Sequence, residues 1–218
     1  MNDDLRLLRL LHLADSALPI GTLSHSWGLE TLAEEALITP EDIESVLEPF
    51  LDDQLFLDAV FCRAAYRAAG DRGELDNLNV LCSARKPMRE SREASLALGR
   101  RFLQLIETCV EQNVAIDIGE LHYCIAFGAI ARHLSIDDDS SVLAFLEQSC
   151  AGLLSCAMRL LPIGQLFANA VLWRAKPRIA ETAKRSRDVD VHNAPCFAPA
   201  LEIAGMRHPL LETRLFVS

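Results

Sequence analysis

Two residues near the end of the chain, His192 and Cys196, could donate an imidazole nitrogen and a thiolate to a metal ion. Two ligands do not close a metal site, so the spacing favours an exposed tail segment over a metal centre. Ser24 and His25 place a hydroxyl beside an imidazole. Neighbours in sequence point in different directions on a helix, so we interpret Ser24 as a helix cap and not as a nucleophile.

Aspartates are the strongest chemical pattern in the sequence. Asp52, Asp53 and Asp58 fall on nearby turns of one expected helix, the pattern with which all-helical prenyl-diphosphate synthases hold magnesium, and Asp137–Asp139 could form a second cluster. Asp137–Asp139 stand at a helix start, where negative charge suits the helix dipole. Basic residues that would hold a diphosphate are not arranged around either cluster. A solvated acidic helix face is the favoured interpretation, with a magnesium-dependent enzyme as the alternative.

The motifs of several enzyme classes are absent from the sequence. It has no Gly-x-x-x-x-Gly-Lys loop and only three lysines, so we expect no nucleotide hydrolysis by this chain alone. His-Glu-x-x-His, Glu-x-x-His and Gly-x-Ser-x-Gly are also missing. The seven cysteines are dispersed without a Cys-x-x-Cys pair, as expected of small core residues in a reducing compartment. We therefore predict no catalytic residue, no tightly bound cofactor and no metal site.

Charge is distributed unevenly along the chain. Residues 1–61 carry thirteen acids and two bases, and the remainder is close to neutral. This asymmetry argues against a nucleic-acid partner and is compatible with a basic protein partner. The first apolar stretch is interrupted by Arg6, Arg9 and Asp15, and the longest charge-free runs are too short to span a bilayer. We expect no signal peptide, no membrane partner and a cytoplasmic location.

The elements that would position these residues are helices throughout. Apolar residues recur at helical spacing, Thr39-Pro40 is a strong helix start, and Pro49 predicts a kink or break. Leu18-Pro-Ile-Gly21 and Leu161-Pro-Ile-Gly164 look like rigid breaks between helices. The predicted fold is all-α: a single domain, 1–218, forming a multi-helix bundle with an irregular C-terminal tail at 186–218 that contains Pro195, Pro199 and Pro209. The expected helices cover residues 3–14, 24–37, 39–69 with the break at Pro49, 74–84, 87–111, 119–134, 140–161 and a last stretch that ends near Arg185.

Four segments, taken in order, resemble the UreF family of urease accessory proteins. The first, residues 13–30, reads Leu-Ala-Asp-Ser-Ala-Leu-Pro-Ile-Gly-Thr-Leu-Ser-His-Ser-Trp-Gly-Leu-Glu. The second is the basic and acidic stretch of residues 84–99, which begins Ala-Arg-Lys-Pro-Met-Arg-Glu. The third, residues 158–165, is Met-Arg-Leu-Leu-Pro-Ile-Gly-Gln, and the fourth runs from His208 to the terminal Arg214-Leu-Phe-Val-Ser218. The chain departs from the family pattern at Leu23, where an aromatic is usual, and at Val217, where Arg is usual.

The resemblance implies an all-α, dimeric accessory protein and not an enzyme. Its expected partners are UreD (also called UreH), the GTPase UreG, and apo-urease, into which nickel is inserted; nickel and GTP would be handled by those partners. Partner-binding residues implied by the matching segments are Pro19, Gly21, Ser24, Ser26, Glu30, Arg159, Gln165, Arg214, Leu215 and Phe216. Among them, Arg159 and Gln165 are expected to contact the GTPase, and the last three to order on UreD.

Two other interpretations stay open on the sequence alone. One is the magnesium-dependent prenyl-diphosphate-type enzyme, and the other is a generic helical adaptor unrelated to urease. The basic run between Arg174 and Arg187 is read as the polar face of a helix, with a docking patch for an acidic partner as its alternative.

Overall fold

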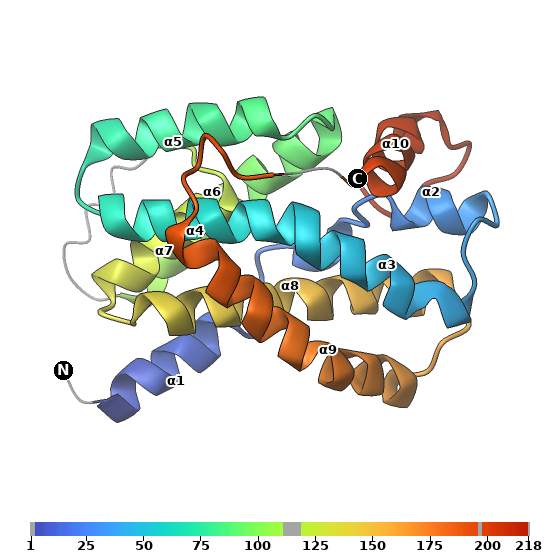
Figure 1. Ribbon diagram of the computed structural model, residues 1–218, viewed down its shortest axis with the longest axis horizontal. Helices are drawn as coiled ribbons and strands as arrows, with labels where there is room; N and C mark the ends of the chain where they lie inside the picture. The colour runs from blue at the N-terminus through green and yellow to red at the C-terminus, as the bar shows by residue number, and fades with distance from the viewer. Residues whose placement is uncertain (1–2, 111–118, 196–197, 218) are drawn as a thin grey trace.

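Helices form every regular element in the described part of the chain, which comprises residues 3–110, 119–195 and 198–217 of a computed structural model. The all-α bundle predicted from the sequence is therefore confirmed. Helices α4, α5 and α8 run along the long axis, with α4 near the middle, and α9 crosses obliquely (Figure 1). The α-helices are α1 (Asp3–Leu13), α2 (Leu29–Glu34), α3 (Ile43–Pro49), α4 (Phe56–Ala68), α5 (Arg72–Arg85), α6 (Arg89–Cys109), α7 (Tyr123–His133), α8 (Asp138–Leu160), α9 (Gln165–Arg185) and α10 (Pro199–Arg207).

Helices α4 and α7 form the centre of the bundle. A Cβ atom added to Gly128 on α7 would lie 2.0 Å from the carbonyl oxygen of Cys62 on α4, so the two backbones touch. Beside this contact the rings of Phe102, Tyr123, Phe127 and Phe145 pack with centroid distances between 5.4 and 6.0 Å. Close backbone approach and aromatic packing together fix α6, α7 and α8 around one core.

Helix α8 is the longest element at 23 residues, and Asp137 caps its start by accepting a hydrogen bond from the Ser140 amide at 2.8 Å. By length and composition alone α8 could cross a membrane, but 61% of its most apolar window is buried inside the fold. That burial is typical of a core helix.

The break predicted at Pro49 takes the form of a change in helix type. Pro49 ends α3, and a π-helical turn (η3, Phe50–Leu55) continues directly into α4. A proline has no amide hydrogen to donate and disturbs the preceding turn, which fits a local departure from α-helical pairing. Phe50 and Leu51 from this turn are buried.

The helix predicted over residues 24–37 starts later than expected. Ser24 ends a short 3-10 turn (η1, Thr22–Ser24), and α2 begins after Gly28, whose φ is 89°. A Cβ on Gly28 would lie 2.6 Å from the carbonyl oxygen of Leu201, so α10 packs directly on the start of α2. Contact with a helix from the other end of the chain, and not the local Ser24 cap, sets this boundary.

The segment 186–218 is more regular than predicted. After the 3-10 turn η4 (Ser186–Asp188) it contains α10 and the 3-10 turn η5 (His208–Leu210). Pro199 stands at the first turn of α10, where its missing amide hydrogen costs nothing. The tail packs on the chain's own core, since Leu201, Ala204 and Phe216 are buried. Figure 1 shows α10 and the chain end beside α2.

Candidate protein-interaction site

Glu30, in the first turn of α2, is a buried carboxylate that holds the end of the chain. Its side chain is 7% exposed. It accepts hydrogen bonds from the backbone amides of Leu215 and Phe216, the latter at 3.1 Å. A buried ionised group needs such partners, because desolvation of a charge without them is costly. Glu30 therefore binds a tail segment nearly two hundred residues away in sequence.

His208 connects Glu30 to a second carboxylate. The ring is fully buried, and its Nε2 lies 2.7 Å from Glu30 while its Nδ1 lies 2.7 Å from Glu90 on α6. The ring therefore bridges the two carboxyl groups, with one nitrogen hydrogen-bonded to each. Arg214 adds a weaker contact to Glu90 at 3.4 Å. The tail is thus tied to both α2 and α6.

Phe216 is covered by the end of α8. Its side chain is 4% exposed, and the Arg159 guanidinium lies 4.4 Å from the centre of its ring. The next amide, of Val217, donates to the Ser24 carbonyl at 2.9 Å. We call these residues the tail clasp, defined as Glu30, Glu90, Arg159, His208, Arg214 and Phe216.

A groove opens on the clasp. It has a volume of about 390 Å³ and runs between α2, the end of α8 and the tail. Both signs of charge line it, with two glutamates and two arginines, and Leu215 contributes an apolar side chain that is 55% exposed. Such a surface suits a protein partner better than a small ligand, because it is open, mixed in charge and partly apolar. Its lining residues are Glu30, Ala33, Glu34, Arg159, Leu160, Thr213, Arg214 and Leu215.

The remaining residues predicted from the sequence lie elsewhere or are buried. Pro19 is exposed, and Gly21 adopts a φ of 86° next to the Arg101 guanidinium, which donates to the Ile20 carbonyl at 3.3 Å. Ser26 is fully buried, so it shapes the turn and offers no outer surface. Gln165 is exposed at the first turn of α9 and does not line the groove.

Each of the four segments singled out in the sequence contributes to the clasp. Glu30 ends the first, Glu90 lies in the second, Arg159 in the third, and His208 begins the fourth. No role is predicted from the sequence for Glu90 or His208, although both lie inside those segments. Glu90 is one of two glutamates among the basic residues of its stretch, so its type alone does not distinguish it. His208, the one histidine of the fourth segment, was the available signal.

The basic run on α9 is paired within the chain. Arg174 contacts Glu44, and Arg178 and Arg185 both contact Asp52. Acids of the N-terminal third therefore pair with three of the arginines of α9, which argues against the docking patch for an acidic partner. The arginines are about half exposed, so each pair contributes only about 0–1 kcal/mol to stability.

The same pairing argues against the magnesium-dependent alternative. Asp58 contacts Lys86 at 2.6 Å, whereas Asp52 contacts arginines of α9. Asp138 and Asp139 contact Arg63 at 3.0 and 2.8 Å, and hydrogen bonds from Arg187 lower the pKa of Asp139. These aspartates are thus divided among different basic partners instead of converging on one cation.

Of the two metal ligands considered in the tail, only His192 lies in the described residues. His192 is exposed, its amide donates to Asp190 at 2.7 Å, and its carbonyl accepts from Arg85. Cys196 lies outside the described residues.

Comparison with known proteins gives one consistent result. The model of the UreF family matches residues 37–176. A urease accessory protein UreF of Kocuria rhizophila is 34% identical, with 97% of each chain covered. That of a Nostoc species is 31% identical over 99% of this chain and 97% of its own, and that of a Bacillus species is 30% identical over 98% and 99%.

Proposed function

Because the chain belongs to the UreF family of urease accessory proteins, we propose that it is a non-catalytic scaffold that holds the GTPase UreG against UreD and apo-urease. The observation that carries this proposal is the tail clasp, which places two candidate partner surfaces in direct contact. In this scheme nickel and GTP are bound by the partners, and the chain works in the cytoplasm.

The surface assigned to UreD is the C-terminal segment. Apolar side chains are concentrated there and remain exposed although the clasp buries Phe216. Contiguous exposed apolar area on a folded protein marks an interaction surface. The exposed members, with the exposed fraction of each, are Ile203 (56%), Met206 (50%), Leu210 (79%), Leu215 (55%) and Val217 (67%).

The surface assigned to UreG lies at the turn between α8 and α9. Arg159 and Gln165 flank this turn, and both are exposed. Leu166 beside it is 90% exposed, and Trp173 two turns further along α9 is 73% exposed. Arginine and tryptophan are enriched among residues that dominate binding energy at protein interfaces.

The clasp gives the two surfaces a physical connection. Arg159 stacks on Phe216, so a partner that displaces the tail removes this ring from the guanidinium, and a partner that binds the guanidinium uncovers the ring. A scaffold that couples two partners needs only such differential binding to two states and no catalytic groups. A homodimer completes the proposal, with the face of α1 as its interface, since Leu7, Leu8 and Leu11 are 56–62% exposed there.

A surface substitution with a matched control tests the UreD assignment. Leu215→Glu places a charge on the exposed apolar tail without removing a clasp contact, and Val80→Glu does the same on α5, where Val80 is 72% exposed. We expect Leu215→Glu to weaken binding to purified UreD at least tenfold in a calorimetric or surface-binding assay, and Val80→Glu to leave it unchanged. Equal affinities for the two variants would exclude the tail as the UreD surface.

A further inference from the structure

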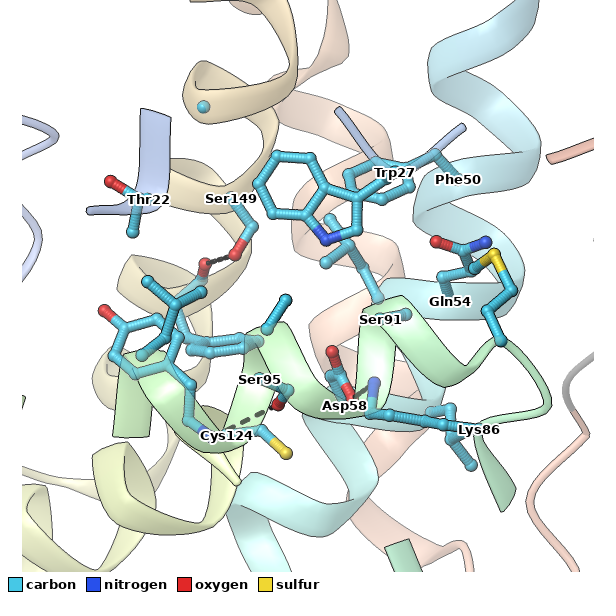
Figure 2. A pocket seen from close by; sticks show the side chains of 18 of the residues that line it. Thr22, Trp27, Phe50, Gln54, Asp58, Lys86, Ser91, Ser95, Cys124 and Ser149 are labelled. Carbon is cyan, nitrogen blue, oxygen red and sulfur yellow. Dashed lines mark hydrogen bonds and ion pairs between the residues drawn. The ribbon is translucent and has the colours of Figure 1, made fainter. Parts of the chain in front are cut away.

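Three side chains from different helices meet in the core beside a cavity. Asp58 on α4, Cys82 on α5 and Cys124 on α7 place one carboxylate oxygen and two sulfurs within 4.8 Å of one another. The two cysteines are 0% and 1% exposed. Figure 2 shows Asp58, Lys86 and Cys124 together at one edge of the cavity.

The spacing of these atoms is close to that of a tetrahedral metal site. The two sulfurs are 4.0 Å apart. In a tetrahedral zinc site with the usual bond lengths, two thiolate sulfurs lie about 3.8 Å apart. A thiolate sulfur and a carboxylate oxygen lie about 3.5 Å apart in the same geometry. Side-chain shifts of an ångström or less would therefore bring all three atoms onto one ion. Two sulfurs and one oxygen form a soft donor set, which suits a thiophilic transition metal and not magnesium or calcium.

Lys86 provides the charge that such a site needs. Its ammonium lies 2.6 Å from Asp58 Oδ1, and the two side chains are 10% and 17% exposed. The group of two thiols, one carboxylate and one ammonium is neutral. The net charge is also zero after a dication has bound, because the two thiols are then thiolates beside the carboxylate and the ammonium.

We propose that Cys82, Cys124 and Asp58 bind a thiophilic divalent transition-metal ion, of which Zn²⁺ is the representative, with Lys86 retained on the carboxylate. On binding, two S–H bonds break, two metal–sulfur bonds and one metal–oxygen bond form, and two protons leave to solvent. No atom changes oxidation state. The proposal does not depend on the scaffold function, and it departs from the expectation of no metal site, which rested on the absence of Cys-x-x-Cys.

The adjoining cavity can supply the fourth ligand and a route for the ion. It has a volume of about 60 Å³, room for a few waters. Gln54, Ser91 and Ser95 add polar atoms to its otherwise largely apolar lining.

Cobalt titration of the full chain tests the site directly. Reduced, chelator-treated protein is titrated with Co²⁺, and the expected result is one equivalent bound with thiolate-to-cobalt charge-transfer absorption that Zn²⁺ abolishes. In weakly buffered solution the titration releases two protons per ion. Cys82→Ser and Cys124→Ser each weaken binding at least tenfold. Cys150→Ser, which removes a buried thiol elsewhere in the core, and Cys109→Ser, which removes an exposed one, leave it unchanged.

Three results would overturn the proposal: no charge-transfer absorption in the unaltered chain, absorption that survives both cluster variants, or absorption lost in Cys109→Ser. If a cluster variant fails to fold by circular dichroism, alkylation of the unaltered chain decides. Under partial denaturation Zn²⁺ must then slow maleimide labelling of Cys82 and Cys124 and not of Cys150, as mapped by mass spectrometry. Equal labelling rates with and without Zn²⁺ would also overturn it.

Discussion

Replacing Glu30 by glutamine should release the C-terminal tail without unfolding the bundle. The Glu30 carboxylate accepts three hydrogen bonds, from His208 and from the amides of Leu215 and Phe216. A hydrogen bond to a charged group contributes about 1 kcal/mol more than a neutral one, so the three together lose about 3 kcal/mol. The amide NH₂ of the glutamine would also face one of the N–H groups that donate to Glu30, and two donors cannot form a hydrogen bond. At about 1.4 kcal/mol per factor of ten, the opening equilibrium of the tail rises about 100-fold.

Hydrogen–deuterium exchange measures this opening. Amides of residues 208–217 should exchange about 100-fold faster in Glu30→Gln, while those of α4 and α7 keep their protection, because the core does not depend on the clasp. Glu34→Gln is the matched control, since Glu34 is exposed on the same helix and lines the same groove. If tail exchange in Glu30→Gln equals that in Glu34→Gln, the clasp does not hold the tail and the reasoning is refuted.

Three further predictions concern the core, pH and assembly. Gly128→Ala should lower the free energy of unfolding in urea by about 1–3 kcal/mol or more, because its methyl group meets the α4 backbone. Gly164→Ala is the control, since a Cβ there has nothing within 4 Å and should not cause overpacking. Burial, with help from two nearby cations, lowers the pKa of His122 from 6.5 to about 3. The unfolded chain therefore binds more protons below pH 6.5, and stability is lost as the pH falls, by about 2 kcal/mol from this residue between pH 7 and pH 5. Between pH 7 and pH 5 the urea midpoint should therefore change less in His122→Gln than in His133→Gln, the control at an exposed site. Equal changes in the two variants would contradict His122 as the source of the pH dependence. Leu8→Glu should convert the proposed homodimer to a monomer, as measured by light scattering, whereas an unchanged mass would exclude α1 as its interface.

Local patterns were sufficient to predict most helices. Residues 138–160 and 165–185 repeat apolar side chains at helical spacing between clear breaks, and the Thr39-Pro40 start is present with both capping contacts. The prediction of an irregular tail was wrong over residues 199–207, because proline does not always mark irregular structure. Pro199 instead opens α10, a position where proline is favourable. The same helix packs on Gly28, a long-range contact that local sequence does not encode.

The candidate site was predictable only in part for the same reason. Arg214 and Phe216 were identified as tail contacts, but their partners Glu90 and Arg159 come from helices that only the fold brings together. Cys82 and Cys124 are 42 residues apart and give no metal-binding spacing in sequence. Their proximity depends on how α5 packs against α7, which periodicity cannot specify.

Co-expression of the chain with UreD and UreG from the same source, followed by size-exclusion chromatography with light scattering, tests the scaffold proposal most directly. The proposal predicts a stable complex with UreD that recruits UreG in a nucleotide-dependent manner and loses UreG when Arg159 is replaced by alanine. A chain that elutes without either partner under every nucleotide and nickel condition would contradict it.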